Sequence, residues 1–339
     1  MVSRAGFLKS VFAVTTPQKP CPQKQFIMTV MVTMACSIGA AYAQPVSAAT
    51  LSTPLEKSAI KYVEFRGDLG LIEGSTIDSE SAMRDAHMRL ASHDPDALSS
   101  GWVAYAALVA ADTPEFAKAI QESVATPEAK TAFLARMRME PRSIRELPGA
   151  DKAIEAVMMM AARDATKINS LGQSFIDRAY SMQNAAWAKK KLSEGMSRVY
   201  EARDYAATRE RAGTPVLPAY VSAGVQLPAL AQTTDREWQA TWSNEEAVPQ
   251  INPRATPIID RVLVLAVRYS VGEVTDPVVD GYAKSDQSRR CLNMAMLNFD
   301  QCIAATRTAY EEAFCIGEHG LNDVSGCLGW VAGAGEADD

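Results

Sequence analysis

The first half of the chain repeats one signature of a helix N-terminus, and this signature constrains the fold more than any other feature. A residue with a capping side chain directly precedes proline at Thr53-Pro54, Asp94-Pro95, Thr113-Pro114 and Thr126-Pro127. The capping side chain accepts hydrogen bonds from the free N–H groups of the first turn, and proline is favoured where no N–H is needed. We therefore expect helices to begin at residues 54, 95, 114 and 127.

The apolar residues that follow these signals recur every three or four positions. Examples are Met83, Ala86 and Leu90, then Leu98, Trp102, Tyr105 and Val109, then Phe116, Ile120 and Val124. This spacing places them on one face of a helix. Alternating, β-branched runs bounded by turn residues are nearly absent. The sequence therefore predicts an all-α fold, an irregular helical bundle with several short helices between 52 and 140.

A longer pattern covers residues 150–191. Large residues recur at intervals of seven, and a second row of mostly small residues accompanies them: Ile154, Ala161, Ile168, Phe175 and Met182, with Met158, Ala165, Gly172, Ala179 and Ala186. Small residues beside large ones let a neighbouring helix approach closely. We expect one long central helix, of roughly 60 Å if Gly172 does not interrupt it. It is interpreted as a core helix of one bundle or as a self-associating coiled coil.

The N-terminal 43 residues have the form of an export signal. Basic residues precede the apolar stretch 26–40, and Ala41-Tyr42-Ala43 forms a small-x-small cleavage site. We expect cleavage near Ala43 and a periplasmic or secreted bacterial protein. Lipoprotein processing at Cys36 and a retained anchor are the alternatives. No other uncharged apolar run is long enough for a transmembrane span.

The charge of the chain excludes nucleic acid as a partner. The leader holds four Lys or Arg residues and no Asp or Glu, so its removal takes the formal charge from −6 to −10. An acidic protein without a basic patch lacks the electrostatic footprint for phosphate backbones. A protein partner or a component of the cell envelope fits this charge better, and the sequence indicates no cofactor.

Composition shifts in the middle of the chain, where six of the 17 prolines lie between 213 and 257. We divide the chain into a signal peptide (1–43), a helical bundle (44–212), a proline-rich linker or strap (213–257) and a C-terminal helical segment (258–339). Within the strap, residues 234–246 are expected to form a short helix that carries Trp238 and Trp242. This pair is interpreted as an aromatic binding surface or as anchors on the core.

Four cysteines remain after the leader, all in the last 49 residues: Cys291, Cys302, Cys315 and Cys327. An even number in an exported chain predicts disulfides. In an antiparallel helical hairpin, facing residues have a constant index sum, and the nested pairs Cys302–Cys315 and Cys291–Cys327 give 617 and 618. The opposing argument is that 303–314 lacks glycine and proline and is expected to be helical throughout. The alternatives Cys315–Cys327 and Cys302–Cys327 therefore stay open.

The glycine-rich segment between Cys315 and Cys327 is expected to be a stapled loop. It carries Glu318 and His319, which we take as a possible binding surface because binding residues often lie on such loops. No metal site is expected, because cysteine spacings of ten to twelve are wrong for zinc and the three histidines form no i, i+4 pair. We expect His87 to be a core residue beside Met83 and Leu90.

Sequence motifs of catalysis are missing. The chain has no Gly-x-Ser-x-Gly elbow, no phosphate-binding loop and no dinucleotide fingerprint. The function that fits best is a non-enzymatic envelope or secreted scaffold or binding module. The alternative is an exported helical hydrolase that acts on cell-wall glycan through paired carboxylates, which would have to come together from distant positions.

Overall fold

The described residues, 53–211 and 249–333 of a computed structural model, form helices and turns and contain no β-strand. The all-α class is thus confirmed for this part of the chain. The α-helices are α1 (Pro54–Glu73), α2 (Glu80–Leu90), α3 (Pro95–Ala111), α4 (Pro114–Ser123), α5 (Pro127–Met139), α6 (Ala150–Ser181), α7 (Gly195–Arg211), α9 (Thr256–Ser270), α10 (Asp276–Tyr282), α11 (Asp286–Ala305), α12 (Ala309–Cys315) and α13 (Asp323–Gly329). A π-helix, η4 (Ile316–Asn322), joins α12 to α13. No helix in these two ranges is long and apolar enough to cross a membrane.

The four helix starts expected from the cap-proline signature are confirmed as the first residues of α1, α3, α4 and α5. Thr53 forms a full capping box with Glu56, and the Asp94 carboxylate accepts a hydrogen bond from the N–H of Ala97 at 2.7 Å. Capping of this kind satisfies donors that the helix itself leaves free. Local sequence chemistry therefore determines where these helices begin.

The core is built around α3, which is apolar on all sides and packs against α1, α9, α6 and α11. A helix without a polar face has to be enclosed by others. The apolar run 262–267 of α9 is buried against it. The helices on either side of the undescribed residues 212–248 therefore share one core, and both belong to the same unit of the chain, residues 45–339.

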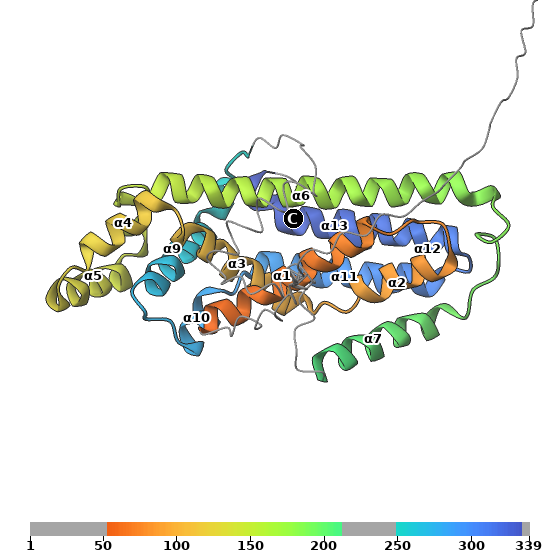
Figure 1. Ribbon diagram of the computed structural model, residues 1–339, viewed down its shortest axis with the longest axis horizontal. Helices are drawn as coiled ribbons and strands as arrows, with labels where there is room; N and C mark the ends of the chain where they lie inside the picture. Colours follow the sequence, from red (N-terminus) through yellow and green to blue (C-terminus); the bar gives the residue numbers. More distant parts are fainter. Residues whose placement is uncertain (1–52, 212–248, 334–339) are drawn as a thin grey trace, which may run out of the picture. The chain divides into compact units, whose positions relative to one another are not determined.

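The long helix α6 lies along α12, η4 and α13 (Figure 1). It ends at Ser181, ten residues before the expected end at 191, and Gly172 does not interrupt it. After Ser181 the chain leaves the helix, because Ala188 and Leu192 are buried against other parts of the protein. The N–H of Leu192 donates to the carbonyl of Arg307 at 2.9 Å. Most residues of the two predicted rows in α6 are buried within this chain.

Gly172 allows α6 and the π-helix to approach closely. A Cβ added at Gly317, the facing glycine, would lie 2.6 Å from the carbonyl oxygen of Gly172 and 3.1 Å from the backbone nitrogen of Ile176. Both atoms belong to the main chain of α6, so no side-chain rotation can make room. Gly172 in the α6 row therefore packs against Gly317 of the C-terminal segment.

We predict that Gly317→Ala lowers the free energy of unfolding by about 1–3 kcal/mol, the usual cost of overpacking a core. Gly326→Ala is the matched control, since a Cβ there meets nothing within 4 Å. In a helix this control is expected to stabilise by up to about 1 kcal/mol. Urea unfolding of both variants checks the prediction, and equal midpoints for the two would refute the close packing of α6 on η4.

Candidate functional site

The C-terminal helices form a hairpin that two nested disulfides hold together. Cys291–Cys327 joins α11 to α13 with a Cα–Cα distance of 5.4 Å, and Cys302–Cys315 joins α11 to α12 at 5.6 Å. Both distances are typical of disulfides. The nested pairing predicted from the index sums is confirmed, and the two other pairings that the sequence left open are wrong.

The turn of this hairpin lies at residues 306–308, where the sequence offers neither glycine nor proline. α11 ends at Ala305, and α12 begins at Ala309 after Thr308. The Glu311 carboxylate accepts hydrogen bonds from the N–H groups of Arg307 at 2.6 Å and Thr308 at 3.0 Å. This is the glutamate half of a capping box, and it satisfies the backbone donors that the turn exposes. The expectation of continuous helix from 303 to 314 is therefore wrong.

A buried charged cluster fixes the position of this turn. The Arg198 guanidinium, from α7, donates to the carbonyls of Ser193 at 2.6 Å and of Ile303 and Thr306 at 3.1 Å each. The His87 Nδ1 lies 3.3 Å from the Glu312 carboxylate, and both side chains are almost fully buried. Burial of charge is tolerated where it is paired in this way. His87 is a core residue, as expected.

A groove opens between the end of α6 and the hairpin turn. Its volume is about 350 Å³, and it is lined by Ala179, Tyr180, Gln183, Cys302, Ala305, Thr306, Tyr310, Glu311, Phe314 and Cys315. We call this cavity the disulfide groove, because Cys302 and Cys315, which form a disulfide, both line it. The rings of Tyr180 and Phe314 meet edge to face with centroids 6.4 Å apart, and Tyr180 is 62% exposed.

Two polar side chains of the disulfide groove, Glu311 and Thr306, are engaged by the protein itself. Glu311 is its one carboxylate, and Oε2 of that residue already accepts two backbone hydrogen bonds. The Thr306 hydroxyl donates to the carbonyl of Ile303 at 2.8 Å. The wall of the groove is mainly apolar, which suits contact with an apolar group.

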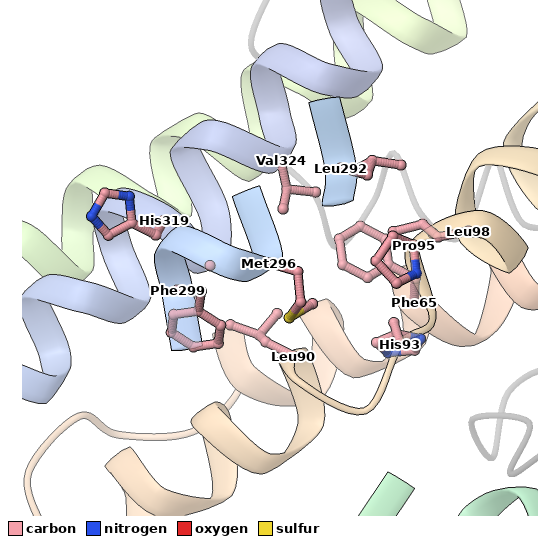
Figure 2. A pocket seen from close by; sticks show the side chains of 11 residues that line it. Phe65, Leu90, His93, Pro95, Leu98, Leu292, Met296, Phe299, His319 and Val324 are labelled. Carbon is pink, nitrogen blue, oxygen red and sulfur yellow. The ribbon is translucent and has the colours of Figure 1, made fainter. Parts of the chain in front are cut away.

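A second cavity lies in the core between α1, α2, α3, α11 and η4, and its walls are almost entirely apolar (Figure 2). Met296 and Leu292 point into it, whereas the imidazole of His319 stands apart from the other labelled side chains. Its volume of about 10 Å³ leaves space for one water-sized sphere. It is a packing defect rather than a ligand site.

Glu318 and His319 are not on a loop, and this expectation is corrected by the structure. Both residues lie in the π-helix η4, and the His319 Nδ1 makes a hydrogen bond with the Asp323 carboxylate at 2.9 Å, one helical turn away. Neither residue lines the disulfide groove. Trp238 and Trp242, the other predicted binding surface, lie outside the described residues.

Asp68 of α1 collects several cationic partners at the end of α7. Its carboxylate lies 2.8 Å from the His93 Nε2, 2.6 Å from the Arg209 Nη1 and 3.0 Å from the Arg89 Nη1. Burial by itself raises the pKa of the Asp68 carboxyl, but the hydrogen bonds and charges of His93 and Arg209 outweigh burial. The pKa of Asp68 is therefore lowered from its ordinary value of 3.8.

We predict that Asp68→Asn destabilises the protein by about 2 kcal/mol at neutral pH, as for other hydrogen bonds to charged groups. A lowered folded-state pKa gives stability that is present above 3.8 and is lost as the pH falls through the folded value. The difference between wild type and variant should shrink below pH 4. Urea midpoints at neutral and acidic pH measure it. Asp85→Asn, a 57% exposed partner of Arg89, is the control, and a pH-independent difference would contradict the prediction.

Comparison with protein-family models, curated proteins and solved structures gives no match for this chain. The disulfide groove is therefore the feature of the molecule that bears on function. No group of three or more His, Cys, Asp or Glu side chains within 53–211 and 249–333 is arranged to hold a metal ion. Among the cavities described here, the groove is the one with the size of a ligand site.

Proposed function

We propose that the protein is an exported, non-enzymatic binding module that holds a small apolar ligand with an aromatic ring in the disulfide groove. The observation that carries this proposal is the groove's volume of about 350 Å³ together with its wall of Tyr180, Tyr310 and Phe314. Pockets for small molecules have volumes of about 300–1,000 Å³ and mostly apolar and aromatic linings. A disulfide and a capped turn hold this wall rigid, which lowers the entropy lost on binding.

The disposition of carboxylates supports binding over hydrolysis. Glycan hydrolysis needs two carboxyl groups that face each other across a cleft. The core cavity is lined by no carboxylate, and the disulfide groove is lined by Glu311 alone. Glu312, the next residue, points instead into the buried cluster with His87. No observation on the described residues favours the hydrolase alternative.

Export to the periplasm or the cell exterior is the second part of the proposal. The basic and apolar leader with its Ala41-Tyr42-Ala43 site supports it, as do two disulfides, which persist in oxidising compartments. Intact mass under non-reducing conditions tests this part. We expect a chain that begins at Gln44 and lacks the four hydrogen atoms lost in two disulfides. A full-length, reduced chain would overturn the export proposal.

Binding of a neutral aromatic probe tests the groove directly. We predict that 2-naphthalenemethanol binds to the purified protein and that Ala305→Trp weakens this binding about tenfold or more, since an indole at this exposed wall position fills the groove. Ala135→Trp, at an exposed position of α5, is the matched control. Isothermal titration measures both. Equal affinity in the two variants, or no binding by wild type, would refute the groove as the site.

A further inference from the structure

The rim of the disulfide groove carries the longest basic run in an otherwise acidic chain. Lys189, Lys190 and Lys191 are consecutive and exposed, and no other three basic residues are adjacent in the sequence. Lys191 forms an isolated antiparallel bridge with Thr308, and the next residue, Leu192, donates its N–H to the carbonyl of Arg307. The lysine run is thereby anchored at the hairpin turn, beside Thr306 of the groove wall.

Much of this positive charge is not compensated within the described residues. Lys190 pairs with Glu80 at 3.5 Å, whereas Lys189, Lys191 and Arg307 have no ion pair with any residue in 53–211 or 249–333. Arg307 is exposed like the lysines. Unpaired cations around a low-dielectric concavity raise the local concentration of anions. The chain as a whole carries excess negative charge, so a cluster of cations at this rim differs from the rest of the molecule.

Negative groups near the rim are already partly offset. The Glu311 carboxylate accepts two backbone N–H groups. The carbonyls at the end of α11, which carry the negative end of the helix dipole, accept hydrogen bonds from the Arg198 guanidinium. An anion at this end therefore meets exposed cations, and the negative charge of Glu311 is partly offset by its two backbone donors.

Among the described residues, no run of basic residues lies beyond the other end of the groove. α6 runs antiparallel to α12, since Gly172 faces Gly317 while Tyr180 contacts Phe314. Asp177 precedes Tyr180 by one turn, and Glu318 follows Phe314 by four residues, so both acids lie away from the hairpin turn. The exposed cations thus cluster at the turn end of the groove, where Glu311 is the one lining carboxylate, whereas Asp177 and Glu318 lie beyond the other end.

We propose that the disulfide groove selects small apolar ligands that carry a negatively charged group, with the aromatic part against Tyr180 and Phe314 and the anion at the turn beside Lys189, Lys191 and Arg307. This inference rests on the proposed function, because it assigns ligand chemistry to the same groove. Carboxylates, sulfonates and phosphates share the required charge, and the groove's volume limits the apolar part to a small ring system.

The test compares two probes of the same shape on the full, disulfide-bonded protein. Isothermal titration with 2-naphthoate is expected to give about tenfold tighter binding than 2-naphthalenemethanol at low salt, and added salt should remove most of this difference. The variant Lys189→Gln/Lys191→Gln/Arg307→Gln should bind 2-naphthoate about tenfold more weakly while its affinity for the alcohol stays unchanged. Unchanged alcohol binding also reports that the groove is intact.

A second triple variant controls for net charge. Lys57→Gln/Arg138→Gln/Arg290→Gln removes the same charge at exposed positions away from the groove, and we expect wild-type binding of both probes. Equal affinity of wild type for the two probes, or an equal effect of the two triple variants, would overturn the anion selectivity and leave the groove as an apolar site. Failure of both probes to bind would overturn the proposed function itself.

Discussion

Replacing Asp164 with alanine is expected to lower the free energy of unfolding by about 3–5 kcal/mol, the usual cost of leaving one member of a buried ion pair behind. The Asp164 carboxylate lies 3.2 Å from the Arg66 Nη2, with both side chains about 95% buried. It also accepts a hydrogen bond from the Tyr62 hydroxyl at 2.5 Å. In the Asp164→Ala variant the Arg66 guanidinium stays buried in the core but no longer has the Asp164 carboxylate beside it.

The local balance of burial and charge explains why this site is sensitive. Burial raises the pKa of the Asp164 carboxyl, and this effect exceeds the opposing charge of Arg66 and the hydrogen bond from Tyr62. The pKa of Tyr62 is likewise raised well above its ordinary value by burial and by the nearby carboxylate. The contacts with Arg66 and Tyr62 therefore offset the burial of the Asp164 carboxylate only in part, and losing either member of the cluster leaves the others poorly solvated.

Removing the charges of Arg66 and Asp164 together distinguishes the effect of breaking the ion pair from the effect of losing packing in the core. We expect the double variant Arg66→Met/Asp164→Leu to recover most of the stability, because apolar residues of similar volume often replace a buried ion pair without loss. Glu122→Ala, from the exposed Lys118–Glu122 pair, should change the stability little. Guanidinium unfolding compares all three. A double variant as unstable as Asp164→Ala would show that packing, not the lost contact between Arg66 and Asp164, causes the loss.

The helix starts were predictable because each depends on neighbouring residues alone. Capping side chains and prolines act within one turn, so α1, α3, α4 and α5 begin where the sequence indicates. The end of α6 depends on distant contacts instead. The seven-residue pattern continues past Met182, but the chain leaves the helix to pair Leu192 with Arg307, more than 100 positions later. No local pattern contains that information.

The hairpin turn has a sequence signal that depends on neither glycine nor proline. Thr308-x-x-Glu311 has the form of a capping box and marks the start of α12. The index sums of the pairs Cys302–Cys315 and Cys291–Cys327 differ by one, and the structure explains this difference. The π-helix η4 lies between Cys315 and Cys327, and its i→i+5 turns take up more residues than α-helical turns. The extra residue on that side of the hairpin is thereby accommodated.

The disulfide groove could not be predicted, because its wall combines residues 179–183 of α6 with residues 302–315 of the hairpin. Each part is unremarkable in sequence, and only the antiparallel packing of α6 on α12 brings them together. The lysine run at 189–191 is visible in the sequence as a charged loop. Its relation to the groove depends on the Lys191–Thr308 bridge, which is again a long-range contact.

Removal of the two disulfides should have different effects on stability and on binding. In the loop-closure model, the 36-residue separation of Cys291–Cys327 is worth about 3.8 kcal/mol and the 13-residue separation of Cys302–Cys315 about 2.9 kcal/mol. Pairwise replacement by alanine is therefore expected to destabilise more at 291 and 327. Cys302 and Cys315 both line the groove, so Cys302→Ala/Cys315→Ala should weaken binding of 2-naphthalenemethanol more.

The two cysteine-pair variants are thus expected to rank in opposite order by stability and by affinity for the probe. Urea unfolding ranks Cys291→Ala/Cys327→Ala as the less stable, and isothermal titration ranks Cys302→Ala/Cys315→Ala as the weaker binder. The longer loop closes the hairpin at α13, away from the groove wall, so its removal acts on the unfolded chain without changing the site. If both variants lose affinity in proportion to their stability, the groove depends on the hairpin as a whole rather than on the bridge that lines it.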